Sequence, residues 1–172
     1  MTLKTERLIL RELTENDFGS LFEILSDRET MQFYPNPFNE EKVADWIRWN
    51  QENYRIFGFG LWAVVLQENN RLIGDCGITM QQIGRRIKPE IGYHIHKEYW
   101  RRGYACEAAR ACRNWLFENT PFQMVFSYMN HTNTASCATA AANGMRLLEE
   151  FSDEVNTITK VYGITREEWE KI

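Results

Sequence analysis

The stretch EIGYHIHKEYWRRGYACEAA, residues 90–109, carries most of the information about the fold. EIGYHIH predicts a strand at 90–96, and the periodic apolar residues that begin at Tyr104 predict a helix to Asn119. A short basic turn containing Gly103 lies between them. The first turn of a helix has unpaired N–H groups and partial positive charge, and a glycine lets a ligand approach the backbone. This turn suits an anion such as a pyrophosphate. The alternative is a solvated basic turn with a packing glycine.

On either side of this stretch the chain alternates irregularly between strands and helices. The order β-α-α-β-β-β-α-β-α-β-β predicts an α+β fold, a mixed sheet with helices on both faces, and a single domain over 1–172. The predicted strands are 6–13, 61–67, 72–80, 90–96, 122–129, 146–151 and 158–164. The predicted helices are 15–26, a second one capped by Asn39 and ended by Gly58, 104–119, 134–143 and 166–171.

The composition is that of an ordinary globular protein. The chain has 172 residues, of which 44% are hydrophobic and 26% charged, so disorder is not expected. A net charge of −4 gives no basic field for nucleic acid. No apolar run approaches the roughly 18–20 residues that span a bilayer, and MTLKTERLIL lacks the features of a signal peptide. We expect a cytoplasmic protein with neither a nucleic-acid nor a membrane partner.

The cysteines give no sign of a metal site. Cys76, Cys106, Cys112 and Cys137 are scattered, without a C-x-x-C pair or clustered histidines. We expect no metal, and reduced, mostly buried thiols.

A second informative segment is NTASCATAAANGM, residues 133–145, which follows the strand at 122–129. Asn133 and Ser136 lie three residues apart at the start of a helix, so both can face one cleft. Asn133 can equally be a simple helix cap.

These segments together resemble the GNAT superfamily of acetyltransferases, in its Rim-type branch, which contains the ribosomal-protein N-terminal acetyltransferases. The resemblance covers nearly the whole chain. It rests on TERLILREL near the start, LIGDCGI at 72–78, EIGYHI and YWRRGYACEAA, NTAS with NGM, and TREEW at 165–169.

The resemblance implies acetyl-CoA as co-substrate. The family's signature, Gln or Arg, two residues, Gly, one residue, then Gly or Ala, falls on WRRGYA at 100–105, with Trp100 departing from the first position. It implies a twisted, mostly antiparallel sheet that splays between the strands at 90–96 and 122–129. Main-chain amides would hold the pyrophosphate, and the end of the 90–96 strand and an asparagine would contact the pantetheine arm. The implied acetyl-CoA site comprises Ile95, Arg101, Arg102, Gly103, Tyr104, Ala105 and Asn133.

Transfer from a thioester to an amine needs a proton acceptor for the amine and, in some cases, a donor for the thiolate. By resemblance Glu90 is the base, and His94, on the same face of the strand, is the alternative. The predicted helix at 134–143 lacks the Tyr that many family members use as acid. Ser136 is the hydroxyl in place for that role, unless the thiolate leaves without one. Glu107 is expected to have a packing role.

The amine itself is not specified. By resemblance Tyr34 and Phe38 lie over the acceptor side of the cleft, whereas Trp46 and Phe57 are expected in the core. The acceptor is a protein N-terminus or a small amine, and the protein a monomer or homodimer. The alternative function is a weakly active or inactive acyl-CoA-binding module.

Overall fold

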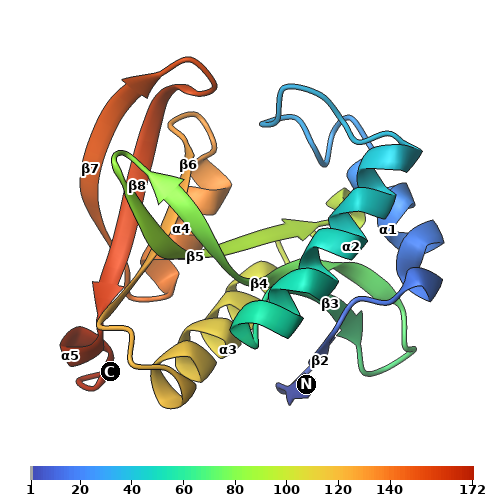
Figure 1. Ribbon diagram of the computed structural model, residues 1–172, viewed down its shortest axis with the longest axis horizontal. Coiled ribbons are helices and arrows are strands. Elements are labelled where there is room, and N and C mark those ends of the chain that lie inside the picture. The colour runs from blue at the N-terminus through green and yellow to red at the C-terminus, as the bar shows by residue number, and fades with distance from the viewer. Residues whose placement is uncertain (1) are drawn as a thin grey trace.

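The computed structural model describes residues 2–172 and places eight strands in one twisted sheet (Figure 1). The strand order is β1-β2-β3-β4-β5-β6-β8-β7, and every neighbouring pair is antiparallel except β5 and β6. The strands are β1 (Thr2–Lys4), β2 (Leu8–Arg11), β3 (Leu61–Leu66), β4 (Leu72–Ile83), β5 (Arg86–Ile95), β6 (Met124–Asn130), β7 (Arg146–Asp153) and β8 (Thr157–Thr165).

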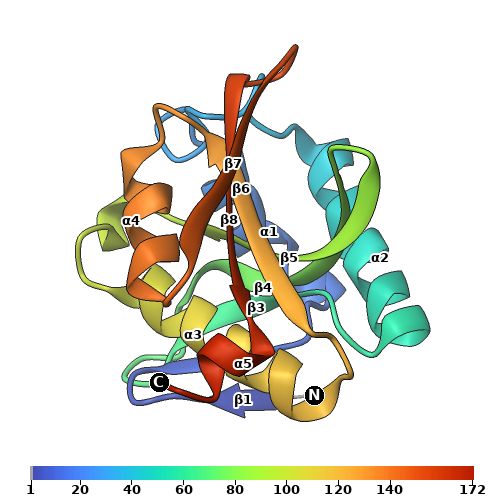
Figure 2. The ribbon, with the colours of Figure 1, turned by 90° about the vertical axis from the view of Figure 1, so that its left-hand side faces the viewer.

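Helices cover both faces of this sheet. Figure 2 shows α3 and α4 on one side of the strands and α2 on the other. The helices are α1 (Phe18–Leu25), α2 (Glu40–Phe57), α3 (Tyr104–Asn119), α4 (Thr134–Ala142) and α5 (Arg166–Trp169), with short 3-10 turns at Glu15–Asp17 and Lys97–Tyr99. None of the helices in residues 2–172 is long and apolar enough to cross a membrane.

The continuous apolar sequence of β3 follows from this coverage. Trp62 and Val64 belong to the core cluster beneath α3, whereas Ala63 and Val65 belong to the cluster beneath α1 and α2. A strand buried on both faces has no polar side, so it reads as an unbroken apolar run.

The sheet opens between β5 and β6. These parallel strands are paired at a single position, Glu90 opposite Phe126. One residue further on, the buried Ser127 hydroxyl donates to the Ile91 carbonyl at 2.6 Å. The fold class, the mostly antiparallel sheet and the splay between these two strands are therefore confirmed.

The main differences from the sequence-based prediction concern the first strand and β5, and the other strand ends shift by at most three residues. The predicted strand 6–13 is shortened to β2, and a strand that was not predicted, β1, precedes it. The Thr5 amide and hydroxyl both donate to the Leu8 carbonyl and form a turn between β1 and β2. Strand β5 begins at Arg86 and runs through Pro89, which is paired with Met80 of β4. The His96 amide bonds to β4, so by alternation the Pro89 nitrogen faces away from β4. The missing N–H therefore removes no bond of that ladder.

Candidate active site

A cavity of about 810 Å³ lies where β5 and β6 diverge. Its walls come from the loop around Thr30–Pro35, α2, β5, the start of α3, the end of β6 and α4. Figure 1 shows β6, β7, β8 and α4 on one side of the molecule and α1 and α2 on the other, and residues of β6, α4 and α2 all line the cavity.

The basic turn before α3 forms one end of this cavity. Gly103 and Arg101 both have positive φ, 80° and 63°, which turns the chain sharply into the helix. Arg101, Gly103, Tyr104 and Ala105 line the cavity, and Arg102 is absent from the described lining. The Arg102 carbonyl instead accepts a bond from Arg7 at 2.9 Å.

Arg7 and Glu107 brace this turn from outside. Glu107 accepts bonds from the Arg7 amide at 2.8 Å, the Arg7 Nε at 2.7 Å and the Thr5 hydroxyl at 2.6 Å. These bonds hold the pKa of Glu107 below its usual range against the opposing effect of burial. Glu107 therefore has the packing role that the sequence predicted.

Trp100 has a specific position although it departs from the family signature. Its indole N–H donates to the Ile95 carbonyl at 2.6 Å and so ties the turn to the end of β5. By strand alternation the polar groups of Ile95 face away from β4, toward the gap. Since the carbonyl is already engaged, a ligand can approach Ile95 through its N–H.

The start of α4 contributes Asn133 and Ser136 to the same cavity. The Asn133 side-chain oxygen accepts from the Ser136 amide at 3.1 Å, so the capping role of Asn133 is confirmed. Its amide NH₂ is not used by that bond. Tyr93 reaches across from β5 and donates its hydroxyl to the Ser136 carbonyl at 3.2 Å.

Glu90 lies at the point where the two strands part. Its side chain is 8% exposed and accepts from the Thr79 hydroxyl at 3.2 Å. Burial raises the pKa of Glu90 to about 8, and the bond from Thr79 opposes this rise. The carboxyl is therefore a group that can exchange a proton near neutral pH.

Three cross-strand pairs place Glu90 and His94 at the two ends of one row. On the face of β4 and β5 that is turned to α2, Thr79 lies opposite Glu90, Gly77 opposite Gly92, and Asp75 opposite His94. A Cβ added to Gly92 would come within 3.0 Å of Glu90 Oε2. The glycine therefore leaves a hollow between the two side chains, and the carboxyl leans into it.

His94 is held by a buried acid. Its Nδ1 lies 2.7 Å from Asp75 Oδ1, and the other Asp75 oxygen accepts from the Trp46 indole at 2.8 Å. Asp75 is fully buried and His94 is 7% exposed. Within residues 2–172, His94 Nε2 has no hydrogen-bond partner, although the residue lines the cavity.

Aromatic rings surround this end of the cavity. Tyr34, 44% exposed, lines it with its ring centre 5.0 Å from that of His94. Phe38 was expected beside it, but it is 5% exposed and packs edge-on behind Trp46, away from the wall. The bulk of Trp46 occupies the wall position instead.

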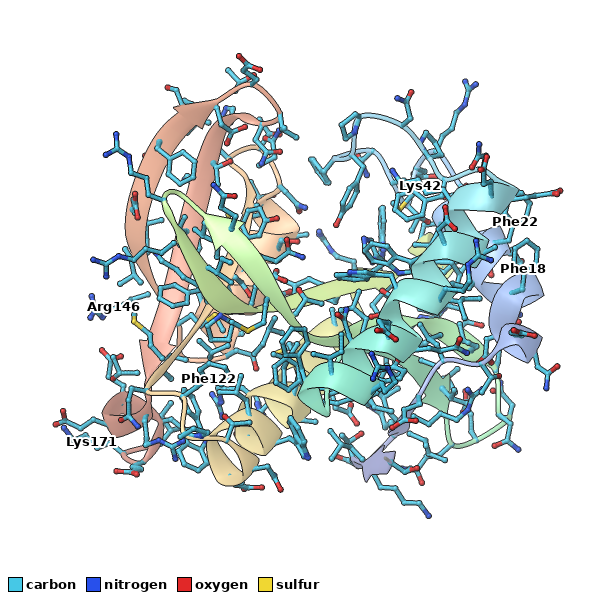
Figure 3. The ribbon with its side chains drawn as sticks, in the orientation of Figure 1. Phe18, Phe22, Lys42, Phe122, Arg146 and Lys171 are labelled. Atoms are coloured by element: carbon cyan, nitrogen blue, oxygen red, sulfur yellow. The ribbon has the colours of Figure 1, made fainter. Side chains whose placement is uncertain are left out.

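The two aromatics expected in the core differ, and only the prediction for Phe57 is wrong. Trp46 packs against the core cluster beneath α1 and α2 and also lines the cavity, because its indole reaches Asp75 on the sheet. Phe57, in the last turn of α2, is 48% exposed and stacks on Phe59. Figure 3 shows another stacked pair, Phe18 and Phe22 on α1, whose half-buried rings have centres 6.0 Å apart.

The two ends of the cavity differ in charge. Arg101 is the one Lys or Arg side chain among its described lining residues, and it lies in the turn before α3. The other end has Glu90 and His94, with Asp75 behind His94. Residues 2–172 hold no group of three or more His, Cys, Asp or Glu placed for a metal ion. The cavity thus joins a basic turn at a helix start to an end lined by a carboxyl and an imidazole.

Asp75, Gly92 and Tyr93 were not predicted as site residues. Asp75 did carry a signal, because a carboxylate inside the apolar run LIGDCGI has to find a buried partner. Nothing in the sequence indicated that Gly92 belongs to the site, because its role depends on the direction in which the Glu90 side chain points.

The comparisons with known proteins all point to the same family. The model of the acetyltransferase (GNAT) domain matches residues 7–146. The chain is 34% identical over 144 residues to YkkB of Bacillus subtilis, covering 83% of this chain and 84% of that protein. It is 33% identical over 137 residues to an uncharacterized N-acetyltransferase, YoaA, of the same species, covering 78% and 76%. A GNAT-family acetyltransferase structure from Bacillus anthracis superposes with a TM-score of 0.83 at 25% identity, covering 97% and 99%.

Proposed function

This chain belongs to the GNAT acetyltransferase family, and from that premise we propose that it moves the acetyl group of acetyl-CoA to a primary amine by direct attack of the amine on the thioester. The observation that carries this proposal is one continuous cavity, which joins the turn before α3 to the buried Glu90 through the gap between β5 and β6.

The turn suits the pyrophosphate of acetyl-CoA. We propose that the amides of Arg101 to Ala105, including Arg102 and Tyr104, hold it at the start of a 16-residue helix. In support, Gly103 lines the cavity, where its backbone is open to a ligand. The Ile95 N–H and the free amide of Asn133 would bond to the pantetheine arm, because both lie on the cavity wall beyond the turn.

Glu90 and Ser136 are the proposed acid–base groups. Glu90 in its ionised form would take a proton from the attacking nitrogen, since it lies at the parting of the strands with a raised pKa. Ser136 would donate to the departing thiolate from the opposite wall, at the start of α4.

The acceptor is proposed to be a protein N-terminus, as in the Rim-type branch, or a small amine. It would enter past Tyr34, whose exposed ring lies at the His94 end of the cavity. The acidic groups at this end and the absence of Lys or Arg from its described lining favour a cationic acceptor.

A screen of amines and N-terminal peptides with acetyl-CoA, monitored by thiol release, tests this function. We expect release above background with at least one class of acceptor. Acetyl-CoA binding without release for any acceptor would favour the binding-module alternative. The matched control is Glu90→Gln, which should bind acetyl-CoA with unchanged affinity and release thiol far more slowly.

A further inference from the structure

The chemistry of the proposed transfer requires two proton losses from one nitrogen. An acceptor amine is an ammonium ion at neutral pH, with three N–H bonds besides its bond to carbon, and the amide product keeps one. One proton must leave before the nitrogen can attack, and a second must leave after the N–C bond has formed. Glu90 supplies one proton acceptor. A second acceptor within reach of the same nitrogen would allow both losses to occur in the site.

We propose that His94 Nε2, oriented by Asp75, is this second acceptor and removes the first proton from the bound ammonium. This inference rests on the proposed acetyl transfer. His94 would then pass the proton to solvent. Glu90 would take the second proton. When the C–S bond breaks, the expelled thiolate would take up a proton through the Ser136 hydroxyl. The reaction therefore balances with one proton released for each ammonium consumed.

The geometry places both groups around one hollow. Glu90 and His94 share a strand face, and Gly92 between them has no side chain to separate them. The Glu90 carboxyl leans over Gly92, toward His94. A small cationic group in this hollow would lie between the two side chains.

The hydrogen bonds of Asp75 fix the chemical state of His94. The carboxylate accepts from the Trp46 indole through one oxygen and lies 2.7 Å from His94 Nδ1 through the other. A carboxylate can only accept, so Nδ1 of the neutral ring carries the proton and Nε2 presents a lone pair. That lone pair is buried, lines the cavity and has no partner among the described residues, so it is a site built for a donor from a ligand.

Groups from several elements face His94. Asp75 from β4 lies 2.7 Å from Nδ1 and orients the ring. Glu90 from its own strand is the other acid, and Tyr34 from the loop before α2 contributes a ring and a phenol. From α2, Trp46 places its ring edge-on, 5.9 Å away between centres, and carries no charge. Because the pKa of Glu90 is about 8, its carboxyl is mostly protonated at pH 7, and His94 is the acceptor available to an arriving ammonium.

The test compares two forms of one acceptor, the primary amine identified by the screen and its aminooxy analogue, which is uncharged at neutral pH. His94→Gln should lower kcat/KM for the amine by about 10²-fold or more and leave the aminooxy analogue nearly unaffected, because the analogue has no first proton to lose. Glu90→Gln should lower kcat/KM for both the amine and the aminooxy analogue. An equal loss for the two acceptors in His94→Gln would show a structural role and overturn the proposal.

Two further variants sharpen this experiment. Asp75→Asn should show the same selective loss, because an amide can donate to Nδ1 and leave the proton on Nε2. His96→Gln is the matched control, since His96 is also buried but is not among the cavity's described lining residues. His96→Gln should leave kcat/KM for both acceptors at the wild-type value.

Imidazole nitrogen NMR keeps the proposal testable without an acceptor. The chain has three histidines, and His94→Gln assigns the signal. We expect neutral His94 to carry its proton on Nδ1. A proton on Nε2 at neutral pH would overturn the proposal. Failure of the amine screen would count against the proposed transfer itself and would leave this measurement unchanged.

Discussion

At the scale of single residues, Glu90 shows how burial prepares a carboxyl for proton transfer. An exposed glutamate is ionised at neutral pH and is a weak base. In this protein the carboxyl is 8% exposed, and its pKa rises to about 8. The ionised form is then more basic than an exposed carboxylate but is the minor form at neutral pH. The rate of transfer should therefore depend on the fraction of Glu90 that is ionised.

The first prediction is that kcat/KM rises with pH up to about 8 and then levels off, because ionised Glu90 is the active form. Glu90→Gln should lower kcat by about 10²–10⁴-fold and lose this dependence, with acetyl-CoA affinity unchanged. The measurement is a pH–rate profile of both proteins with one acceptor. Wild-type turnover in Glu90→Gln at pH 7 would remove Glu90 from the role of base.

Stability gives an independent check on the same pKa. The folded pKa of about 8 lies above the ordinary value of 4.5, so folding favours the neutral carboxyl. The contribution of the protonated Glu90 carboxyl to the free energy of unfolding is fully present below pH 4.5 and is lost as the pH rises toward 8. Denaturation should therefore show Glu90→Gln gaining stability relative to the wild type by about 1 kcal/mol per pH unit in this window. Glu41→Gln, on the exposed face of α2, should follow the wild type.

The sequence predicted that Glu90 lies on this strand but not its surroundings. The EIGYHI motif indicated the strand, but Pro89 suggested that it begins at Glu90, whereas β5 begins at Arg86. Its contact with Thr79 and the hollow beside it at Gly92 depend on how β4 and β5 are paired. The register of that pairing cannot be predicted from the sequence of either strand alone. Asp75 escaped prediction for the same reason.

At the scale of secondary-structure elements, local signals decided which boundaries were predictable. The bounds of α3 agree with the prediction, because Gly103 precedes it and its apolar period is regular. The cap of α2 by Asn39 and its end at Gly58, in the left-handed conformation, were likewise visible in the sequence. The division between β1 and β2 was not, because it depends on the bonds of Thr5 to Leu8 inside an uninterrupted strand-like sequence.

The prediction at this scale concerns the turn that opens α3. Gly103→Val should weaken acetyl-CoA binding by about tenfold or more, because a β-branched residue disfavours the positive φ of this turn and would displace the amides proposed to hold the pyrophosphate. It should also cost about 1–2 kcal/mol of stability, since φ is +80°. Isothermal titration calorimetry measures the first effect and chemical denaturation the second.

Arg101→Ala is the matched control for that turn. It also has positive φ, 63°, and an alanine there meets the same backbone requirement as the arginine. Because only a screened side-chain charge is lost, its effect on affinity should be smaller than that of Gly103→Val. Unchanged affinity in Gly103→Val would place the pyrophosphate elsewhere in the cavity.

At the scale of the whole molecule, the active site depends on a defect in an otherwise continuous sheet. The antiparallel half β1 to β5 and the half β6 to β8 meet through one paired position and the bond from Ser127 to Ile91. The cavity that follows from this gap exposes polar strand groups and costs stability. A ligand that contacts β5, α3 and α4 together would join the two halves.

The last prediction follows from that arrangement. Acetyl-CoA at about 100 times its Kd should stabilise the fold by roughly 2.7 kcal/mol. For a chain of 172 residues this corresponds to a rise in Tm of about 5–10 °C, measurable by differential scanning calorimetry. Gly103→Val should show a lower Tm alone and a much smaller rise, whereas Glu90→Gln should show the full rise, because Glu90 lies at the acceptor end. Equal Tm with and without acetyl-CoA in the wild type would contradict the proposed site, since a ligand bound across both halves of the sheet must favour the folded state.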